Sequence, residues 1–135
     1  MSIFNKDQCV RMIEALAEDQ GEKGYSIKSE LFAKFFNQLE KHALSLTSYN
    51  LCRALACLES VLKHPQVLSS KTELKRLQMR ATFLIDRLAE MLSRESDVAV
   101  LDLYWSNKFA CNIEKVLTQN LNSDVGYHPL DLRKL

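Results

Sequence analysis

The spacing of apolar residues along the chain predicts helices rather than strands. Apolar side chains recur every three or four positions in five stretches, roughly residues 6–20, 26–45, 48–64, 71–94 and 97–121. Residues 25–64 contain neither glycine nor proline, and residues 66–125 also lack both. Sheet proteins need turn residues more often than this. We therefore predict an all-α fold, an antiparallel bundle of about five helices joined by short connections.

Capping residues mark where these helices begin. Asn5 is followed three positions later by Gln8, and Ser70 by Glu73, which is the spacing of a capping box. A Thr-Ser pair at positions 47 and 48 offers a cap for the third helix, and a Ser-Asp pair at 96 and 97 offers one for the fifth. Pro65 should end the third helix, because a residue before proline avoids helical backbone angles.

The segment 98–105 could be read in two ways. Its β-branched and aromatic residues are typical of a strand. No second strand is visible in the chain, and a single strand has nothing to pair with. We therefore assign this segment to the fifth helix.

The last two predicted helices carry the most distinct apolar faces. The face of the helix over 71–94 consists of Leu74, Leu77, Ala81, Leu84, Leu88 and Met91, widened by Ile85 and Leu92. The face of the next helix is expected to contain Val98, Leu101, Trp105, Phe109, Ile113, Val116 and Leu117. The first face is broad enough either to complete the core of a monomer or to leave a groove for a partner helix or a second copy.

Length and charge limit the range of functions. A chain of 135 residues fits one domain, which we place at residues 1–121, followed by an extended tail at 122–135. The net charge of +1 provides no overall positive field to attract nucleic acid. The longest stretch without a charged residue is 11 residues, which is too short for a membrane-spanning helix. We therefore expect no membrane partner and no signal peptide.

The four cysteines predict free thiols in the cytoplasm. Cys9, Cys52, Cys57 and Cys111 show no spacing typical of a disulfide framework, and a domain of this size does not need one. Cys52 and Cys57 would lie about 140° apart around a helix, so both could not face one metal ion. The histidines are scattered, and we predict neither a metal site nor a cofactor.

No catalytic motif is visible in the sequence. The glycine-rich phosphate loop, the dinucleotide fingerprint and the Gly-x-Ser-x-Gly elbow are all missing from the chain. We therefore predict no catalytic residues and no enzyme activity. A site assembled from distant residues, such as a cysteine with a histidine, would show as one cysteine that reacts preferentially with thiol probes.

The charges are distributed unevenly. Residues 70–94 contain six basic and three acidic residues, a local net charge of +3. Arg80, Arg87 and Arg94 are seven positions apart, which aligns them along one edge of the helix. They could pair with acidic residues of the first and fifth helices, or they could bind nucleic acid. Interspersed Asp86 and Glu90 favour pairing within the bundle.

The most economical function is therefore a non-enzymatic, cytosolic protein–protein interaction module such as an adaptor, small regulator or chaperone-like partner. The alternative is a nucleic-acid-binding regulator that uses the basic edge. We expect the contacts to involve Arg80, Arg87, Arg94 and Tyr104. The three arginines form the basic edge, and tyrosine is enriched at binding hot spots. The partner would be another protein or a second copy of this chain.

Overall fold

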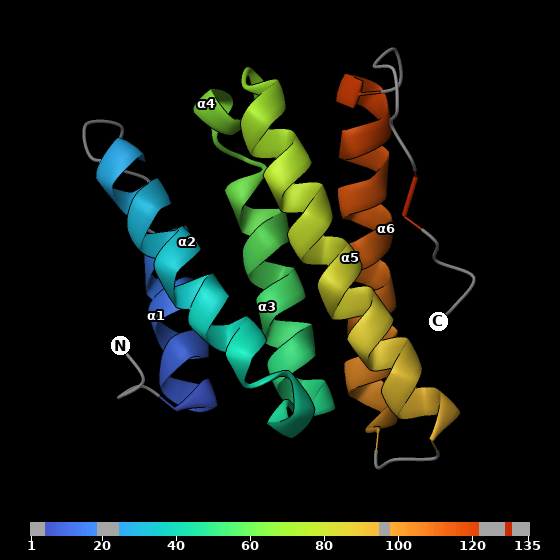
Figure 1. Ribbon diagram of the computed structural model, residues 1–135. Helices are drawn as coiled ribbons and strands as arrows, with labels where there is room; N and C mark the ends of the chain where they lie inside the picture. Colours follow the sequence, from blue (N-terminus) through green and yellow to red (C-terminus); the bar gives the residue numbers. More distant parts are fainter. Residues whose placement is uncertain (1–4, 19–24, 95–97, 122–128, 131–135) are drawn as a thin grey trace.

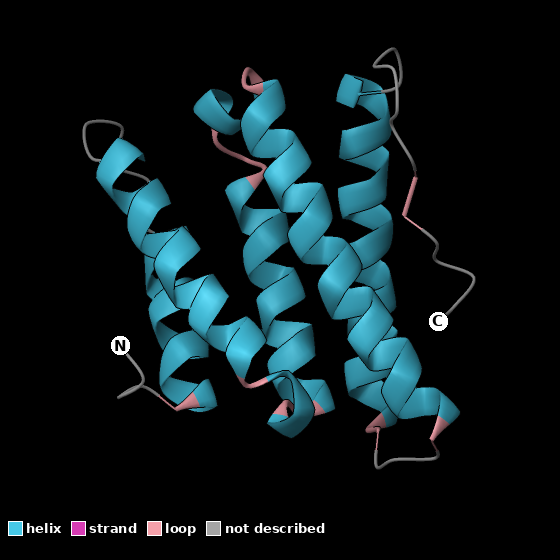
Figure 2. Ribbon diagram, viewed as in Figure 1, coloured by secondary structure: helices cyan, strands magenta, loops and turns pink. Residues whose placement is uncertain are grey.

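The computed structural model describes residues 5–18, 25–94, 98–121, 129 and 130 (Figure 1). Its helices are α1 (Lys6–Glu18), α2 (Tyr25–Lys41), the short 3₁₀-helix η2 (Ala43–Ser45), α3 (Ser48–Val61), α4 (Pro65–Leu68), α5 (Lys71–Ser93) and α6 (Val100–Leu121). These described residues contain no strand (Figure 2). The predicted all-α bundle of about five helices is confirmed, with the single-turn α4 added after Pro65.

Helix α3 lies at the centre of the bundle. It packs against α1, α5 and α6, while α2 packs on α1. Consecutive long helices run in opposite directions, so α1 and α2 form one side of the molecule and α6 forms the other (Figure 1). Short connections force this arrangement, because the chain reverses direction after each helix.

The central position of α3 explains its composition. Eight of its 14 residues are buried, including two small cysteines and two polar residues. Asn50 is buried because it closes the start of the helix. Its backbone nitrogen donates to the Thr47 hydroxyl at 3.1 Å, and its side-chain oxygen accepts from the Thr47 nitrogen at 3.1 Å. Thr47 is therefore the cap of α3, and the helix begins at Ser48.

Two of the other predicted capping residues, Asn5 and Ser70, are also confirmed. The Asn5 side chain accepts from the Gln8 nitrogen at 2.8 Å, and the Gln8 side chain accepts from the Asn5 nitrogen at 3.0 Å. The Ser70 hydroxyl accepts from the Glu73 nitrogen at 3.3 Å. The predicted cap at 96 and 97 lies outside the described residues. From Val100 onward the chain is helical, so the helical interpretation of the segment 98–105 is confirmed there.

Most residues of the broad apolar face of α5 are buried in the core. All seven of its buried residues are apolar, and Ile85 on the widened flank is among them. These seven residues therefore help to complete the core of the bundle, while Leu92 on the widened flank is half-buried.

The predicted apolar face of α6 is wrong at two positions. Leu101 and Trp105 are exposed, although Ile113 and Leu117 are buried as expected. The buried face consists of Ser106, Ala110, Ile113, Leu117 and Leu121. The helix is rotated from the predicted orientation, so that the small residues Ser106 and Ala110 lie in its buried face. The bulkier residues at 101 and 105 are thereby turned outward.

Only two residues of the predicted tail are described. Leu130 is buried against the core, and its backbone nitrogen donates to the Glu114 side chain at 2.8 Å. This contact places Leu130 on α6. The rest of the tail, residues 122–128 and 131–135, lies outside the described residues.

Candidate functional site

Helix α6 exposes a run of large apolar side chains. We call Val100, Leu101, Tyr104, Trp105 and Lys108 the aromatic stripe. Its four apolar members are between 44% and 80% exposed, with Val100 the most exposed and Trp105 the least. Their spacing of three and four residues places Leu101, Tyr104, Trp105 and Lys108 side by side on two turns of the helix. Apolar residues exposed singly are ordinary, but a contiguous group marks a candidate binding surface.

The side chains of the stripe support one another. The Tyr104 and Trp105 rings meet edge to face with centroids 5.3 Å apart, and Trp105 stacks on half-buried Phe109 at 5.9 Å. The Lys108 ammonium lies 5.4 Å from the Trp105 ring and 6.0 Å from the Tyr104 ring. Such contacts between a cation and aromatic faces are attractive. The stripe is therefore an ordered apolar surface that carries a positive charge at one end.

Polar contacts with α3 hold the start of α6 in place. The Ser48 hydroxyl donates to Asp102 at 2.8 Å and accepts from the Ala99 nitrogen at 3.4 Å. Further along, the Asn112 side chain donates to Glu59 at 2.9 Å. These bonds fix the rotation of α6, and that rotation keeps the stripe facing outward.

The Cys52 thiol of α3 is buried in the bundle, on the helix against which α6 packs. Burial raises the pKa of the Cys52 thiol, and the charge of Asp102 raises it further. A thiol with a raised pKa is a poor nucleophile, because the reactive species is the thiolate. The surroundings of Cys52 therefore favour the protonated thiol.

Two of the predicted contact arginines are engaged within the bundle. The Arg87 guanidinium donates to the carbonyls of Ala43 and Leu44 at 2.8 and 3.4 Å and to Glu90 at 3.0 Å. Arg94 pairs with the same Glu90 at 2.7 Å. The pairing is internal, but the acidic partner lies on α5 itself. The sequence had suggested acidic residues of the helices that are now α1 and α6.

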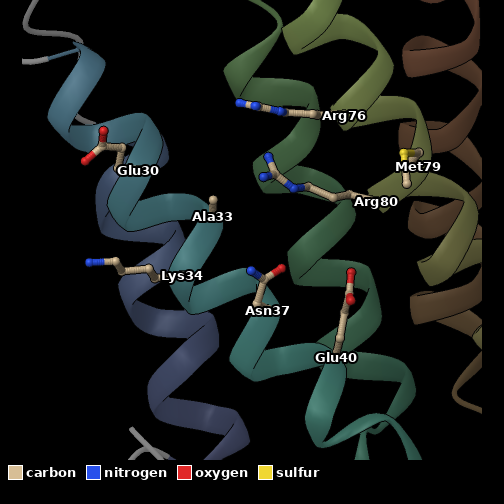
Figure 3. Close-up of a pocket in the computed structure, with 8 residues that line it drawn as sticks. All are labelled: Glu30, Ala33, Lys34, Asn37, Glu40, Arg76, Met79 and Arg80. Carbon is tan, nitrogen blue, oxygen red and sulfur yellow. The ribbon is translucent and has the colours of Figure 1, made fainter.

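The third arginine lies beside an open groove between α2 and α5. Arg80 extends from α5 toward α2 (Figure 3), and its guanidinium lies 5.4 and 5.5 Å from the rings of Phe32 and Phe36. The groove has a volume of about 510 Å³. It is lined by Glu30, Ala33, Lys34, Asn37, Glu40, Arg76, Met79 and Arg80.

The groove mixes both signs of charge. Glu30 and Glu40 stand among three basic residues, and Arg76 pairs with Glu73 at 3.1 Å. Its described lining contains no cysteine, serine or histidine, so it offers no nucleophile with an adjacent base. Alternating charges also make a poor track for a phosphate backbone. The groove is the weaker candidate site.

The structure thus separates the four predicted contact residues. Arg80 faces α2, Arg87 and Arg94 pair with Glu90, and Tyr104 stands on the outside of α6 with 56% of its surface exposed. Sequence reasoning missed Leu101, Trp105 and Lys108 as surface partners of Tyr104. A second helical periodicity, through positions 106, 110, 113 and 117, could have indicated the true buried face of α6. Its first two residues, Ser106 and Ala110, are small.

The described part of the chain offers neither a metal site nor a membrane-spanning helix. No group of three histidine, cysteine, aspartate or glutamate side chains is placed to hold a metal ion there. Among the same residues, no helix has the length and apolar character needed to cross a membrane.

Comparison with known proteins adds no relative. No protein-family model, curated protein sequence or solved structure matches this chain. The functional argument therefore depends on the aromatic stripe and its surroundings.

Proposed function

We propose that this protein is a non-enzymatic, cytosolic interaction module that binds another protein through the aromatic stripe of α6. The observation that carries the proposal is the exposure of Leu101, Tyr104 and Trp105 on a helix whose opposite face already completes the core. Tyrosine and tryptophan are enriched in the residues that dominate binding energy at protein interfaces. Tyr104 is the one predicted contact residue that belongs to this surface.

Other features support the same proposal. All four cysteines are free, which is typical of proteins kept in a reducing compartment. Arg87 donates to two backbone carbonyls and a carboxylate, so its charge is already satisfied within the bundle. This favours a protein partner over the alternative of nucleic acid bound along the basic edge.

Site-specific photocrosslinking tests the proposal. A benzophenone amino acid replaces Tyr104, and a matched variant carries it at Thr82, an exposed position on α5. Irradiation in lysate of the host cell should give a discrete protein adduct at position 104 and none at position 82. Equal adducts at both positions, or none at 104, would contradict the proposal. An adduct that disappears after nuclease treatment would support the nucleic-acid alternative.

A further inference from the structure

The exposed side of α6 has one sign of charge. The exposed residues of this helix include two lysines, Lys108 and Lys115, and no aspartate or glutamate. No described carboxylate forms an ion pair with either lysine. The aromatic stripe therefore continues into a positively charged segment.

The acidic residues of α6 are turned inward and engaged. Asp102 accepts from Ser48, and Glu114 accepts from the Thr118 hydroxyl at 2.8 Å and from the Leu130 nitrogen. On the neighbouring α3, half-buried Glu59 accepts from Asn112. These carboxylates fix the bundle, and none of them faces the lysines as an ion-pair partner. A partner that supplies carboxylates would complete the surface.

The spacing of the stripe indicates the shape of that partner. Leu101, Tyr104, Trp105 and Lys108 occupy positions i, i+3, i+4 and i+7, which is the pattern by which one helix receives another. From Leu101 to Lys115 the helix rises about 21 Å. Resting on the function proposed above, we propose that the stripe receives an amphipathic helix of another protein, with apolar residues against Leu101, Tyr104 and Trp105 and carboxylates against Lys108 and Lys115.

Charge argues against the two other occupants. In a contact between two copies of α6, both surfaces would present lysines and neither would offer an exposed carboxylate. Anionic membrane surfaces are recognised by clusters of about four to eight basic residues. This surface has two. An acidic helix satisfies both the apolar and the charged part of the surface.

A helical peptide library tests the partner's chemistry. Each displayed peptide keeps one leucine face and carries glutamate, glutamine or lysine at each flanking position. Selection on the full-length protein should enrich glutamate over lysine by about fivefold or more at low salt, as expected for charges at the rim of an interface. Selection on the Lys108→Glu, Lys115→Glu double variant should reverse the preference. Both lysines are exposed, so the variant should fold, and circular dichroism checks this.

Tryptophan fluorescence locates the binding of selected peptides. Trp105 is the only tryptophan, so peptides that lack tryptophan should shift its emission to shorter wavelength as they cover the stripe. The Leu101→Ser, Tyr104→Ser double variant is the control and should lose binding at least tenfold. Equal selection of glutamate and lysine, or no selection at all, would overturn the proposal.

The remaining outcomes identify the other occupants. A Trp105 shift with phosphatidylserine vesicles but with no peptide would assign the stripe to a lipid surface. A shift that depends only on protein concentration, with a dimer in sedimentation, would assign it to a second copy. A protein adduct at position 104 combined with failure of the peptide test would leave the interaction function standing and remove the acidic helix.

Discussion

Helices α5 and α6 are almost equal in length, with 23 and 22 residues, and both pack on α3, yet they use their apolar residues differently. Every buried residue of α5 is apolar. By contrast, α6 buries Ser106 and Ala110 and leaves Leu101 and Trp105 outside.

The difference separates residues that the bundle needs from residues that it does not need. Apolar side chains buried in α5 stabilise the fold, because each removes surface from water. The exposed members of the aromatic stripe add little to the stability of the monomer. Their presence is therefore explained better by a partner than by folding, and three matched pairs of measurements test this contrast.

The largest expected effect compares two leucines. Leu84→Ala on α5 removes a fully buried side chain and should lower the free energy of unfolding by about 2–5 kcal/mol. Leu101→Ala removes the same atoms from a side chain that is 71% exposed. This variant should change the free energy of unfolding by less than about 0.5 kcal/mol. Urea denaturation followed by circular dichroism measures both. Similar losses would mean that Leu101 belongs to the core and that the stripe is not a free surface.

The sequence predicts α5 far better than α6, for a physical reason. In α5 the periodic leucines coincide with the positions that face its neighbours, so hydrophobicity alone locates the core. In α6 the buried face includes Ser106 and Ala110, which hydrophobic spacing does not single out. A sequence cannot show that a small residue faces the core until the helix opposite it is known.

The candidate site was predictable only in part for the same reason. Tyr104 was identified from the enrichment of tyrosine at binding hot spots, whereas Trp105 was assigned to the buried face and is in fact exposed. The internal pairing of Arg87 depends on the carbonyls of Ala43 and Leu44 in η2, a turn more than 40 residues away in the sequence. Long-range partners of this kind leave no local pattern.

The thiols provide the second comparison, between α3 and α6. Cys52 is buried in α3, whereas Cys111 is exposed on α6. A neutral-pH thiol reagent should label Cys111 at least about 100-fold faster, because Cys52 reacts only when the structure opens. Mass spectrometry of the peptides gives each rate, and a Cys111→Ser variant isolates the slow phase. Equal rates would show that α3 is accessible in the native state.

Two buried thiols, Cys9 and Cys52, make stability depend on pH. Burial raises the pKa of Cys9 and of Cys52 in the folded protein. The folded state then binds these protons more tightly than the unfolded state, whose thiols have a pKa of about 8.5. Their contribution is fully present below that value and is lost as pH rises through the raised pKa. The urea midpoint should therefore fall above about pH 8.5, and a Cys9→Ala, Cys52→Ala variant should show a smaller fall.

The smallest effect compares two arginines one heptad apart on α5. The Arg87 side chain is 12% exposed and donates to two carbonyls of η2, whereas Arg94 is 66% exposed and pairs only with Glu90 among the described residues. Arg87→Ala should cost about 1–3 kcal/mol in unfolding free energy, since it removes a hydrogen bond from a charged donor to the half-buried Ala43 carbonyl. Arg94→Ala should cost less than about 0.5 kcal/mol, the range for an exposed pair within one helix.

The shared partner Glu90 makes this comparison decisive. If the ion pair with Glu90 were the stabilising contact, both alanine variants and Glu90→Gln would lose similar amounts. If the hydrogen bonds to the η2 carbonyls are the main stabilising contact, Arg87→Ala should lose more unfolding free energy than Arg94→Ala or Glu90→Gln. Arg87→Lys should then recover only part of the loss, because one ammonium cannot reproduce the guanidinium fork. That result would assign Arg87 to the fold and leave the basic edge of α5 without its central contact residue, and the aromatic stripe would then be the stronger candidate for binding a partner.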